Sequence, residues 1–414
     1  MTELSRDQDP FRCMKCGFCM SVCPVYGVDL LEGHVARGRN VLIQMAMDNQ
    51  ISAAEHYREI LSYCLLCRRC EAVCPARLSP DQITLQARNQ AFEKIGLTRL
   101  QSLVNRALLS HRTGLARMIG LVALFPSIAS DGKKPLRHLA DAANVFSKSV
   151  SFPTLSSPIL KKRIKRITPP PDDQIARGQV AIFPGCVFEF FQATIGEDIA
   201  TVLAKAGYEV IYPEGLSCCG QAVHSVGDFK TARTMARRNI DILSSYDRVV
   251  TGCATCGSAL KAYGQWLSQD QEWQERALVF SEKVADFSEF MADEGYLKED
   301  QSHDPLRVTY HDPCHLRQHQ GVTDAPRKIL NAMPGLEYIE MENADACCGL
   351  GGSFGISHRD ISQTIQDKKI EAIKRTGAQA VITSCPGCLM YIMNGVKRHG
   401  LPVKVMHIAQ LLAD

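Results

Sequence analysis

Two cysteine runs near the amino terminus constrain this chain more than any other feature. Both have the spacing C-x₂-C-x₂-C-x₃-C-P, in which a proline follows the fourth cysteine. The first three cysteines of such a run fit on one tight loop, and the proline carries the fourth away from that loop. The runs are Cys13, Cys16, Cys19 and Cys23-Pro24, then Cys64, Cys67, Cys70 and Cys74-Pro75.

This doubled spacing is that of bacterial two-cluster ferredoxins, in which the fourth cysteine of each run binds the [4Fe–4S] cluster of the other. Disulfides are a weaker interpretation, because no signal peptide opens the chain and so dense a cysteine set in a cytosolic protein indicates metal. Zinc also binds paired C-x₂-C units, but it needs neither the third cysteine nor the Cys-Pro ending. We therefore predict two [4Fe–4S] clusters, with zinc as the alternative. The predicted ligands are Cys13, Cys16, Cys19 and Cys74 for one cluster and Cys64, Cys67, Cys70 and Cys23 for the other.

Length and composition indicate a globular protein of two or three domains. The chain has 414 residues, of which 45% are hydrophobic and 22% charged. The net charge of +3 is too small to indicate a nucleic-acid partner. No apolar run approaches the roughly 20 residues that span a bilayer. We expect a cytoplasmic protein, attached to the inner face of the membrane only as a peripheral subunit if at all.

A five-cysteine pattern occurs twice in residues 178–414. The copies are Cys186, Cys218, Cys219, Cys253 and Cys256, then Cys314, Cys347, Cys348, Cys385 and Cys388. Between the first cysteine and the double cysteine lie 31 residues in one copy and 32 in the other. Between the double cysteine and the C-x₂-C lie 33 and 36. Spacings this similar indicate an internal repeat, and all 18 cysteines of the chain fall into motifs.

Apolar segments alternate with helical ones in both copies, which predicts α/β units with parallel sheets. Each cysteine group follows a predicted strand, where open α/β sheets place their ligands. The predicted strands are 180–183, 207–212 and 248–251, then 308–310, 336–339 and 380–383. The predicted helices are 195–205, 229–243 and 362–375.

The N-terminal module is predicted to be α-helical, with helices over 41–47 and 80–94. The second helix would begin with Ser79 as cap and Pro80 in the first turn. Segment 97–128 has a basic amphipathic pattern that favours a packed helical hairpin over a surface that docks to a partner or membrane. The basic run at 161–166, followed by three prolines, is typical of a solvated, semi-rigid linker. We predict an N-terminal α-helical ferredoxin domain (1–100), a connector (101–177) and two tandem α/β cysteine-rich domains (178–300 and 301–414).

The five-cysteine pattern resembles the cysteine-rich CCG domain of heterodisulfide reductases. Joined to the two-cluster module, it resembles the iron–sulfur subunit family of glycolate oxidase, to which lactate-utilisation iron–sulfur proteins are similar. In heterodisulfide reductase a complete five-cysteine copy holds a non-cubane cluster, so the resemblance implies one or two further clusters here. Their implied ligands are the ten cysteines of the two copies. Gly349, Gly351, Gly352 and Gly355 would let the backbone approach inorganic sulfides closely.

No flavin or nucleotide fingerprint is visible, so we expect no flavin on this chain. The resemblance then implies the electron-transfer subunit of a flavin-dependent glycolate or D-lactate dehydrogenase. It would form a hetero-oligomer with a flavoprotein subunit and pass electrons towards quinone, with a quinone-reactive membrane component as a further partner. The alternative is a heterodisulfide-reductase-like catalytic subunit, with Cys347, Cys348 and His315 as catalytic candidates. His311, His315 and His224 could donate a proton, although a supporting hydrogen bond is the simpler role for each.

Overall fold

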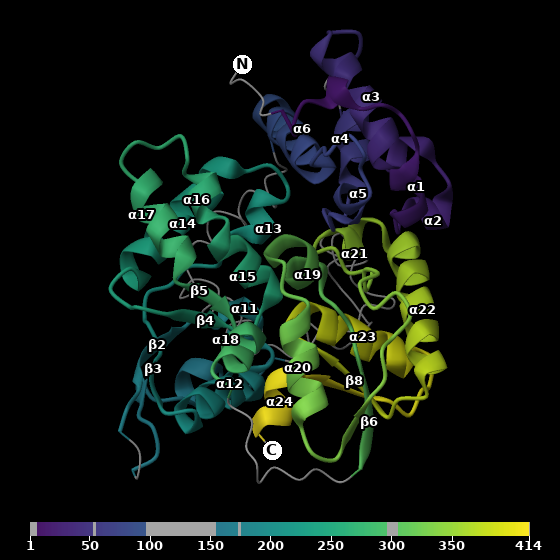
Figure 1. Ribbon diagram of the computed structural model, residues 1–414. Helices are drawn as coiled ribbons and strands as arrows, with labels where there is room; N and C mark the ends of the chain where they lie inside the picture. The colour runs from purple at the N-terminus through teal and green to yellow at the C-terminus, as the bar shows by residue number, and fades with distance from the viewer. Residues whose placement is uncertain (1–5, 53–54, 97–154, 173–174, 296–304, 414) are drawn as a thin grey trace, which may run out of the picture.

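The computed structural model of the chain contains an N-terminal helical module and two α/β modules (Figure 1). The helical module lies against both α/β modules, each of which has its own sheet. The described residues are 6–52, 55–96, 155–172, 175–295 and 305–413.

The N-terminal module is helical throughout its described residues, as the sequence predicts. Its helices are α1 (Phe18–Val22), α2 (Tyr26–Asp29), α3 (Ala36–Met47), α4 (Glu55–Ser62), α5 (Arg69–Ala72) and α6 (Pro80–Ile95), with 3₁₀ turns η1 (Pro10–Arg12) and η2 (Glu32–His34). Helices α3, α4 and α6 meet in a small apolar core that includes Ile43, Leu61 and Ile83. This core supports the cysteine loops that connect the shorter helices.

Two details of this module differ from the prediction. The helix predicted from residue 41 begins at Ala36, which places Arg39 one turn before Ile43 on the buried face of α3. Ser79 occupies the N-cap position of α6, but it does not cap the helix. Its hydroxyl instead donates to Asp7 Oδ2 at 3.0 Å.

The first α/β module has a five-stranded sheet in the order β1-β3-β2-β4-β5. Its strands are β1 (Ile167–Thr168), β2 (Gly178–Ile182), β3 (Tyr208–Ile211), β4 (Val249–Thr251) and β5 (Val284–Asp286). Neighbouring strands are parallel except β1, which pairs antiparallel with β3. Its helices are α11 (Gly185–Phe190), α12 (Ala193–Lys205), α13 (Gln221–His224), α14 (Phe229–Leu243), α15 (Ala254–Lys261), α16 (Tyr263–Trp266), α17 (Gln274–Glu282) and α18 (Phe287–Asp293).

The second α/β module has a fully parallel four-stranded sheet in the order β7-β6-β8-β9. Its strands are β6 (Leu306–Tyr310), β7 (Leu336–Tyr338), β8 (Ala380–Thr383) and β9 (Lys404–His407). Its helices are α19 (Cys314–Gln320), α20 (Asp324–Ala332), α21 (Phe354–Ser357), α22 (Arg359–Thr376), α23 (Pro386–Arg398) and α24 (Ile408–Ala413).

The two sheets repeat one topology, since β3-β2-β4-β5 corresponds in order and direction to β7-β6-β8-β9. The predicted strands and helices are all present, so the predicted parallel α/β repeat is confirmed. The last strand of each sheet was not predicted from the sequence. Strand β5 has only three residues, and β9 has a single buried residue, so neither shows a strong apolar pattern.

One apolar core extends through both α/β modules. Val180 and Val250 of the first sheet belong to the same buried cluster as Val308 and Ile382 of the second. The C-terminal helix α24 packs against α12 of the first module, and α20 packs against α18. A continuous apolar core therefore holds the two α/β modules together, and it brings the cysteine loops of both sheets close to each other.

The basic run at 161–166 is anchored to the first module and is not the free linker that was predicted. Leu160, in the 3₁₀ turn η4 (Leu160–Lys162), is fully buried in the shared core. It packs against Gly196 of α12 so closely that a Cβ on this glycine would lie 2.6 Å from Leu160 Cδ2. Strand β1 follows and extends the sheet. The charged side chains of the run face solvent while its apolar residues hold the backbone.

Segment 97–128, predicted as a helical hairpin or docking surface, lies outside the described residues. Within the part of the chain that the structure describes, no helix is both long and apolar enough to cross a membrane.

Replacing Leu160 with alanine tests this anchor. We expect Leu160→Ala to lower the free energy of unfolding by about 2–5 kcal/mol, because it leaves a cavity in the shared core. Ile175→Ala is the matched control, since Ile175 is 95% exposed and its truncation should change stability by less than about 0.5 kcal/mol. Denaturant unfolding of the anaerobically purified protein, followed by circular dichroism, measures both. Equal stability of the two variants would contradict the anchor.

Candidate functional site

Two cavities in the N-terminal module are lined by the cysteines of both runs. Their empty volumes, which include space open to solvent, are about 400 and about 370 Å³. The first is lined by Cys13, Cys16, Cys19, Cys70 and Cys74, and the second by Cys23, Cys64, Cys67 and Cys70. The fourth cysteine of each run thus lies in the cavity of the other run. Because Cys70 lines both cavities, the two sites are direct neighbours.

The two cysteine loops have matching backbone conformations. Lys15 and Gly17 have φ angles of 56° and 89° in the first loop. Leu66 and Arg68 repeat this pattern in the second, with 53° and 60°. Backbones that alternate in this way turn successive N–H groups to one side and form concavities that bind anions and iron–sulfur clusters. Three non-glycine residues in a region they seldom adopt indicate that this loop shape is required.

Two arginines, Arg39 and Arg88, lie beside the second cavity, and neither was predicted from the sequence. Arg39 is 2% exposed, and it donates to the carbonyl oxygen of His34 at 2.5 Å. Burial acts to lower its pKa, but the thiols of Cys64 and Cys23 raise that pKa above its usual value. Arg88 donates to the carbonyl oxygen of Cys64 at 2.7 Å, and burial lowers its pKa to about 10. The second cavity therefore has positive charge buried next to it.

The five cysteines of the first α/β module converge past the carboxyl ends of β2, β3 and β4. Cys253 is the N-cap of α15, and its sulfur accepts a hydrogen bond from Cys256 N at 3.4 Å. Only Cys186 is partly exposed, and the other four are buried. The thiols contact one another in the order Cys186, Cys218, Cys219, Cys256 and Cys253.

The second module repeats this arrangement past β6, β7 and β8. Cys348 and Cys388 have their sulfurs 3.4 Å apart. Cys314 is partly exposed, as Cys186 is in the first copy, and the other four are buried. The thiols contact one another in the order Cys314, Cys347, Cys348, Cys388 and Cys385.

The two rows of sulfurs approach each other at Cys253 and Cys385, whose thiols lie close enough to shift each other's pKa. The backbone N–H of Ala254 donates to Ser384 O at 3.1 Å at this junction. Thr255 Oγ1 lies 3.7 Å from Cys385 Sγ. The ten cysteines of the repeat therefore form one continuous row across the boundary between the α/β modules.

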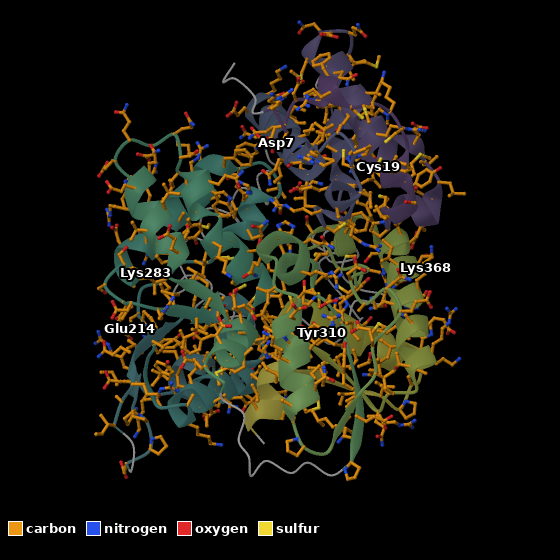
Figure 2. All side chains as sticks on the ribbon, viewed as in Figure 1. Asp7, Cys19, Glu214, Lys283, Tyr310 and Lys368 are labelled. Carbon is orange, nitrogen blue, oxygen red and sulfur yellow. The ribbon has the colours of Figure 1, made fainter. Side chains whose placement is uncertain are left out.

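The second ferredoxin site adjoins the second five-cysteine site. Cys67 packs in one apolar cluster with Cys347 and, at its edge, Cys314. Arg69 pairs with Asp345 across this boundary, with Nε and Oδ2 3.1 Å apart. On the flank of the same interface, Lys368 Nζ of α22 donates to a backbone carbonyl of α2 at 2.6 Å (Figure 2). The row of cysteines thus continues into the N-terminal module.

The glycine-rich loop after Cys348 is explained by packing within the protein. Gly349 has a φ of 102°, and a Cβ there would lie 2.6 Å from Ser362 O. Gly351 has a φ of 52°, and its Cβ would lie 2.2 Å from Leu65 Cδ2 of the N-terminal module. The predicted reason for these glycines was close approach to inorganic sulfide. The structure supplies another reason for Gly351, namely close docking of the second α/β module against the N-terminal module, and for Gly349, namely packing against α22.

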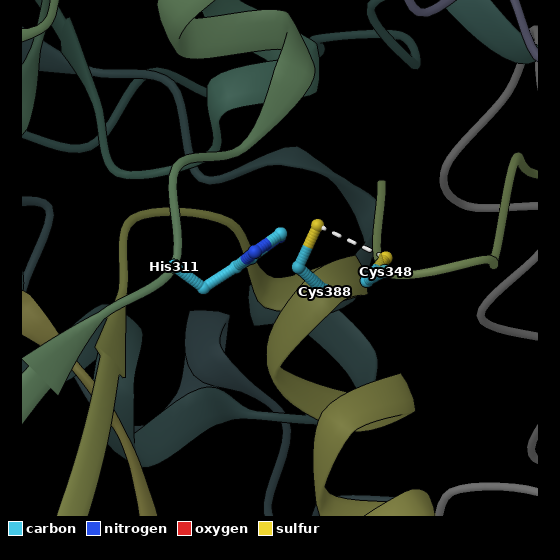
Figure 3. Close-up of side chains that lie close together, drawn as sticks. All are labelled: His311, Cys348 and Cys388. Carbon is cyan, nitrogen blue, oxygen red and sulfur yellow. Dashed lines mark hydrogen bonds between the residues drawn. The ribbon is translucent and has the colours of Figure 1, made fainter. Parts of the chain in front are cut away.

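The three histidines predicted near the cysteines have different surroundings. His311 is fully buried, and one of its ring nitrogens lies within 4.8 Å of the sulfurs of Cys348 and Cys388 (Figure 3). Burial lowers the pKa of His311 to about 3, so its imidazole is neutral. His315 has its Nδ1 3.8 Å from Cys314 Sγ. Both therefore belong to the second site.

His224 is held by aromatic packing. Its ring stacks between Phe229 and Trp266, with centroid distances of 4.4 and 4.1 Å. A further histidine, His319, was not predicted. Its Nε2 donates to Leu66 O at 2.9 Å, next to Cys67 of the second ferredoxin loop. This bond links α19 to that loop.

The donor set fits iron–sulfur clusters. All 18 cysteines are free, and they fall into four groups of neighbouring sulfurs. Burial raises the pKa of Cys70, and hydrogen bonds that the Cys256 thiol donates to Cys219 and Cys253, together with burial, raise the pKa of Cys256. Such thiols ionise only when a cation compensates the charge, which is what the iron of a cluster supplies.

Two family models match this chain. A 4Fe-4S dicluster domain matches residues 10–78, and a cysteine-rich domain named CCG matches residues 180–261 and 308–393. The CCG matches fall once on each α/β module, which confirms the repeat. The dicluster match covers both cysteine runs.

Three curated relatives are informative. A probable glycolate oxidase iron–sulfur subunit of Bacillus subtilis (strain 168) is 31% identical over 97% of this chain and 93% of its own length. A fumarate reductase (CoM/CoB) subunit of Methanothermobacter marburgensis is 32% identical over 97% of this chain and 71% of its own. Lactate utilization protein A of Geobacillus sp. (strain WCH70) is 35% identical over 56% of this chain and 98% of its own.

One solved structure shares the fold. A hypothetical protein from Helicobacter pylori matches with a TM-score of 0.52, covering 91% of this chain and 67% of its own. The sequences are 8% identical, so this likeness concerns the fold alone.

Removing the charge of Arg39 should lower the reduction potential of the cluster in the second cavity. A unit positive charge about 6 Å from a cluster, at an effective dielectric constant of about 20, stabilises the added electron by roughly 2–3 kcal/mol. This energy corresponds to a shift in reduction potential on the order of 100 mV for one electron. An EPR-monitored redox titration of Arg39→Met measures the shift. Arg58→Met on α4 is the control and should leave all potentials unchanged. An unshifted potential in Arg39→Met would contradict the electrostatic role.

Proposed function

This chain belongs to the family of glycolate oxidase iron–sulfur subunits, and we propose that it is the electron-transfer subunit of a flavin-dependent 2-hydroxyacid dehydrogenase. Glycolate or D-lactate would be oxidised on a flavoprotein partner in the same hetero-oligomer. Electrons would pass through this chain towards quinone, with a membrane component as the acceptor. The protein is then peripheral, on the cytoplasmic side of the membrane. The proposed domains remain 1–100, 101–177, 178–300 and 301–414.

We propose two [4Fe–4S] clusters and one non-cubane cluster in each five-cysteine site. The N-terminal assignment is supported by the two cavities, each of which contains three cysteines of one run and the last cysteine of the other. The non-cubane assignment is supported by the adjacent cysteines of each copy, whose thiolates can bridge irons. The proposed ligands are Cys13, Cys16, Cys19 and Cys74; Cys23, Cys64, Cys67 and Cys70; Cys314, Cys347, Cys348, Cys385 and Cys388; and Cys186, Cys218, Cys219, Cys253 and Cys256.

The continuous order of these sites is the observation that carries the proposal. Cys70 connects the two ferredoxin sites, Cys67 adjoins Cys347, and Cys385 contacts Cys253. Such a row suits single-electron transfer over a long distance, because each site has a direct neighbour. A flavin on the partner would convert the two-electron oxidation of the hydroxyacid into single-electron steps that clusters can accept.

We propose that the flavoprotein docks at the first ferredoxin site. This end of the row contains Cys16, which is exposed. Phe11, Met14 and Phe18 beside it in the sequence are 50%, 62% and 58% exposed. Large apolar side chains at the surface are typical of protein interfaces, where aromatic residues and methionine are enriched.

Co-purification under anaerobic conditions tests the partner and its docking surface together. We expect the tagged wild-type chain to bring down a flavin-containing dehydrogenase. Phe18→Glu should weaken this association by about tenfold or more, because a charge replaces an aromatic contact. Ile356→Glu is the control, since Ile356 is 46% exposed but lies on the second α/β module. A complex that lacks a flavoprotein, or equal binding by both variants, would contradict this part of the proposal.

Cys347→Ser tests whether the five-cysteine sites carry electrons. In the purified complex, the variant should still reduce an artificial dye with the hydroxyacid substrate, because the flavoprotein is intact. Quinone reduction should fall by at least about 10- to 100-fold, since even changes beside metal ligands have effects of that size. Full quinone reduction by Cys347→Ser would show that the second five-cysteine site does not lie on the electron path.

A second candidate function is favoured by the junction of the two five-cysteine sites. Both copies are complete, and they meet at Cys253 and Cys385. Under this alternative the chain reduces a disulfide at the sites themselves, with Cys347, Cys348 and His315 in catalytic roles. Cys347→Ser would then abolish disulfide reduction by the complex, and no hydroxyacid-dependent dye reduction would be found in the wild type.

A further inference from the structure

The two five-cysteine sites differ at the residue that follows the central strand of each sheet. After β2 the chain reads Phe183-Pro184-Gly185-Cys186, and after β6 it reads His311-Asp312-Pro313-Cys314. His311 therefore occupies in the second copy the position that Phe183 occupies in the first. Both side chains are fully buried. The duplicated fold thus carries an imidazole at one site and a phenyl ring at the other.

The backbone holds His311 firmly at the end of β6. Its N–H donates to Ile382 O at 2.9 Å, and its carbonyl oxygen accepts from Thr383 Oγ1 at 3.2 Å. These bonds to β8 fix the direction of the side chain. Figure 3 shows the ring pointing towards the sulfurs of Cys348 and Cys388. One ring nitrogen and the two sulfurs all lie within 4.8 Å of one another.

Neither ring nitrogen of His311 makes a well-formed hydrogen bond to the described residues, although the backbone of Ala344 lies near the ring. Burying a polar group without a partner costs about 1–3 kcal/mol, so a buried imidazole in this position needs a compensating interaction. An imidazole nitrogen facing two thiolates is a donor set that iron and zinc accept. The geometry therefore indicates a ligand beyond the five cysteines.

We propose that His311 is a sixth metal ligand of the second five-cysteine site, binding through one ring nitrogen the iron that Cys348 and Cys388 hold. The inference rests on the proposed clusters and adds a ligand that the first site lacks. Histidine ligands raise the reduction potential of a cluster compared with thiolates alone. The two non-cubane clusters would therefore differ in spectrum and potential although their cysteine sets match.

Phe183 shows that the fold accepts a phenyl ring at this position, so His311→Phe is the natural test variant. His315→Phe is the matched control, because His315 is a second buried histidine of the same site whose Nδ1 lies 3.8 Å from Cys314 Sγ. His311→Cys is the conservative variant. It replaces the nitrogen with a thiolate and should retain the metal.

The measurement is made on the full, anaerobically purified chain, labelled with ¹⁵N-histidine and enriched in ⁵⁷Fe. Pulsed EPR of redox-poised samples should detect a strongly coupled histidine nitrogen on the signal that Cys347→Ser removes. Mössbauer spectra cover states without an EPR signal and should contain an iron component distinct from the thiolate-bound irons. Both features should disappear in His311→Phe and His311→Cys and persist in His315→Phe. The iron content of His311→Cys should equal that of the wild type.

A nitrogen coupling too weak for direct coordination, or one that survives in His311→Phe, would overturn the inference. So would zinc in place of iron at the second site. If these results came with normal quinone reduction, only the role of His311 would fail. Absence of any metal in the second site would overturn both this inference and the proposed electron path. If His311→Phe misfolds, His311→Cys still tests the inference. A His311→Cys protein that keeps its full iron content but loses the coupled nitrogen is expected only if His311 is the ligand.

Discussion

The proximity of cysteine sulfurs across module boundaries is the constraint on which the rest of the structure depends. Cys67 must lie beside Cys347, and Cys253 beside Cys385, although the two cysteines of each pair belong to different modules and are far apart in sequence. Electron transfer tolerates little displacement, so the contacts that fix these positions matter as much as the ligands. Among them are the shared core of the α/β modules and the close approach of Gly351 to the N-terminal module.

A duplicated sheet produces two sites with the same cysteine geometry, but their surroundings differ. The second site lies between the ferredoxin module and the first site. It also has the ammonium of Lys369 nearby, whose pKa burial lowers to about 8 even though the thiols of Cys348 and Cys347 raise it. Together with His311 in place of Phe183, this gives the two copies different electrostatics. The repeat therefore provides one geometry, and the residues behind the cysteines give each site its own properties.

The sequence was sufficient for features that local patterns encode. Cysteine spacing predicted the four groups, and apolar runs predicted the parallel repeat, because loops and strands are formed by neighbouring residues. It was insufficient for features that depend on packing between distant segments. Strands β5 and β9, the anchoring of Leu160 and the contact of Cys253 with Cys385 belong to this class. Arg39 could have been predicted from the sequence, because it lies four residues before Ile43 on the same helix face. An arginine on a buried face next to cysteines indicates charge compensation.

The linear order of the sites clarifies how the two candidate functions are related. In both, electrons are proposed to enter at the end near Cys16, which is exposed, and to move towards the five-cysteine sites. The functions differ in what would happen at the five-cysteine sites, from which electrons would either leave for quinone or break a disulfide. Most of the repeat cysteines are buried, whereas Cys186 and Cys314 are partly exposed. An acceptor or a disulfide must therefore approach past one of these two cysteines. Cys314 lies against the N-terminal module, so under the proposed electron path the first copy, with its partly exposed Cys186, would be the exit towards quinone.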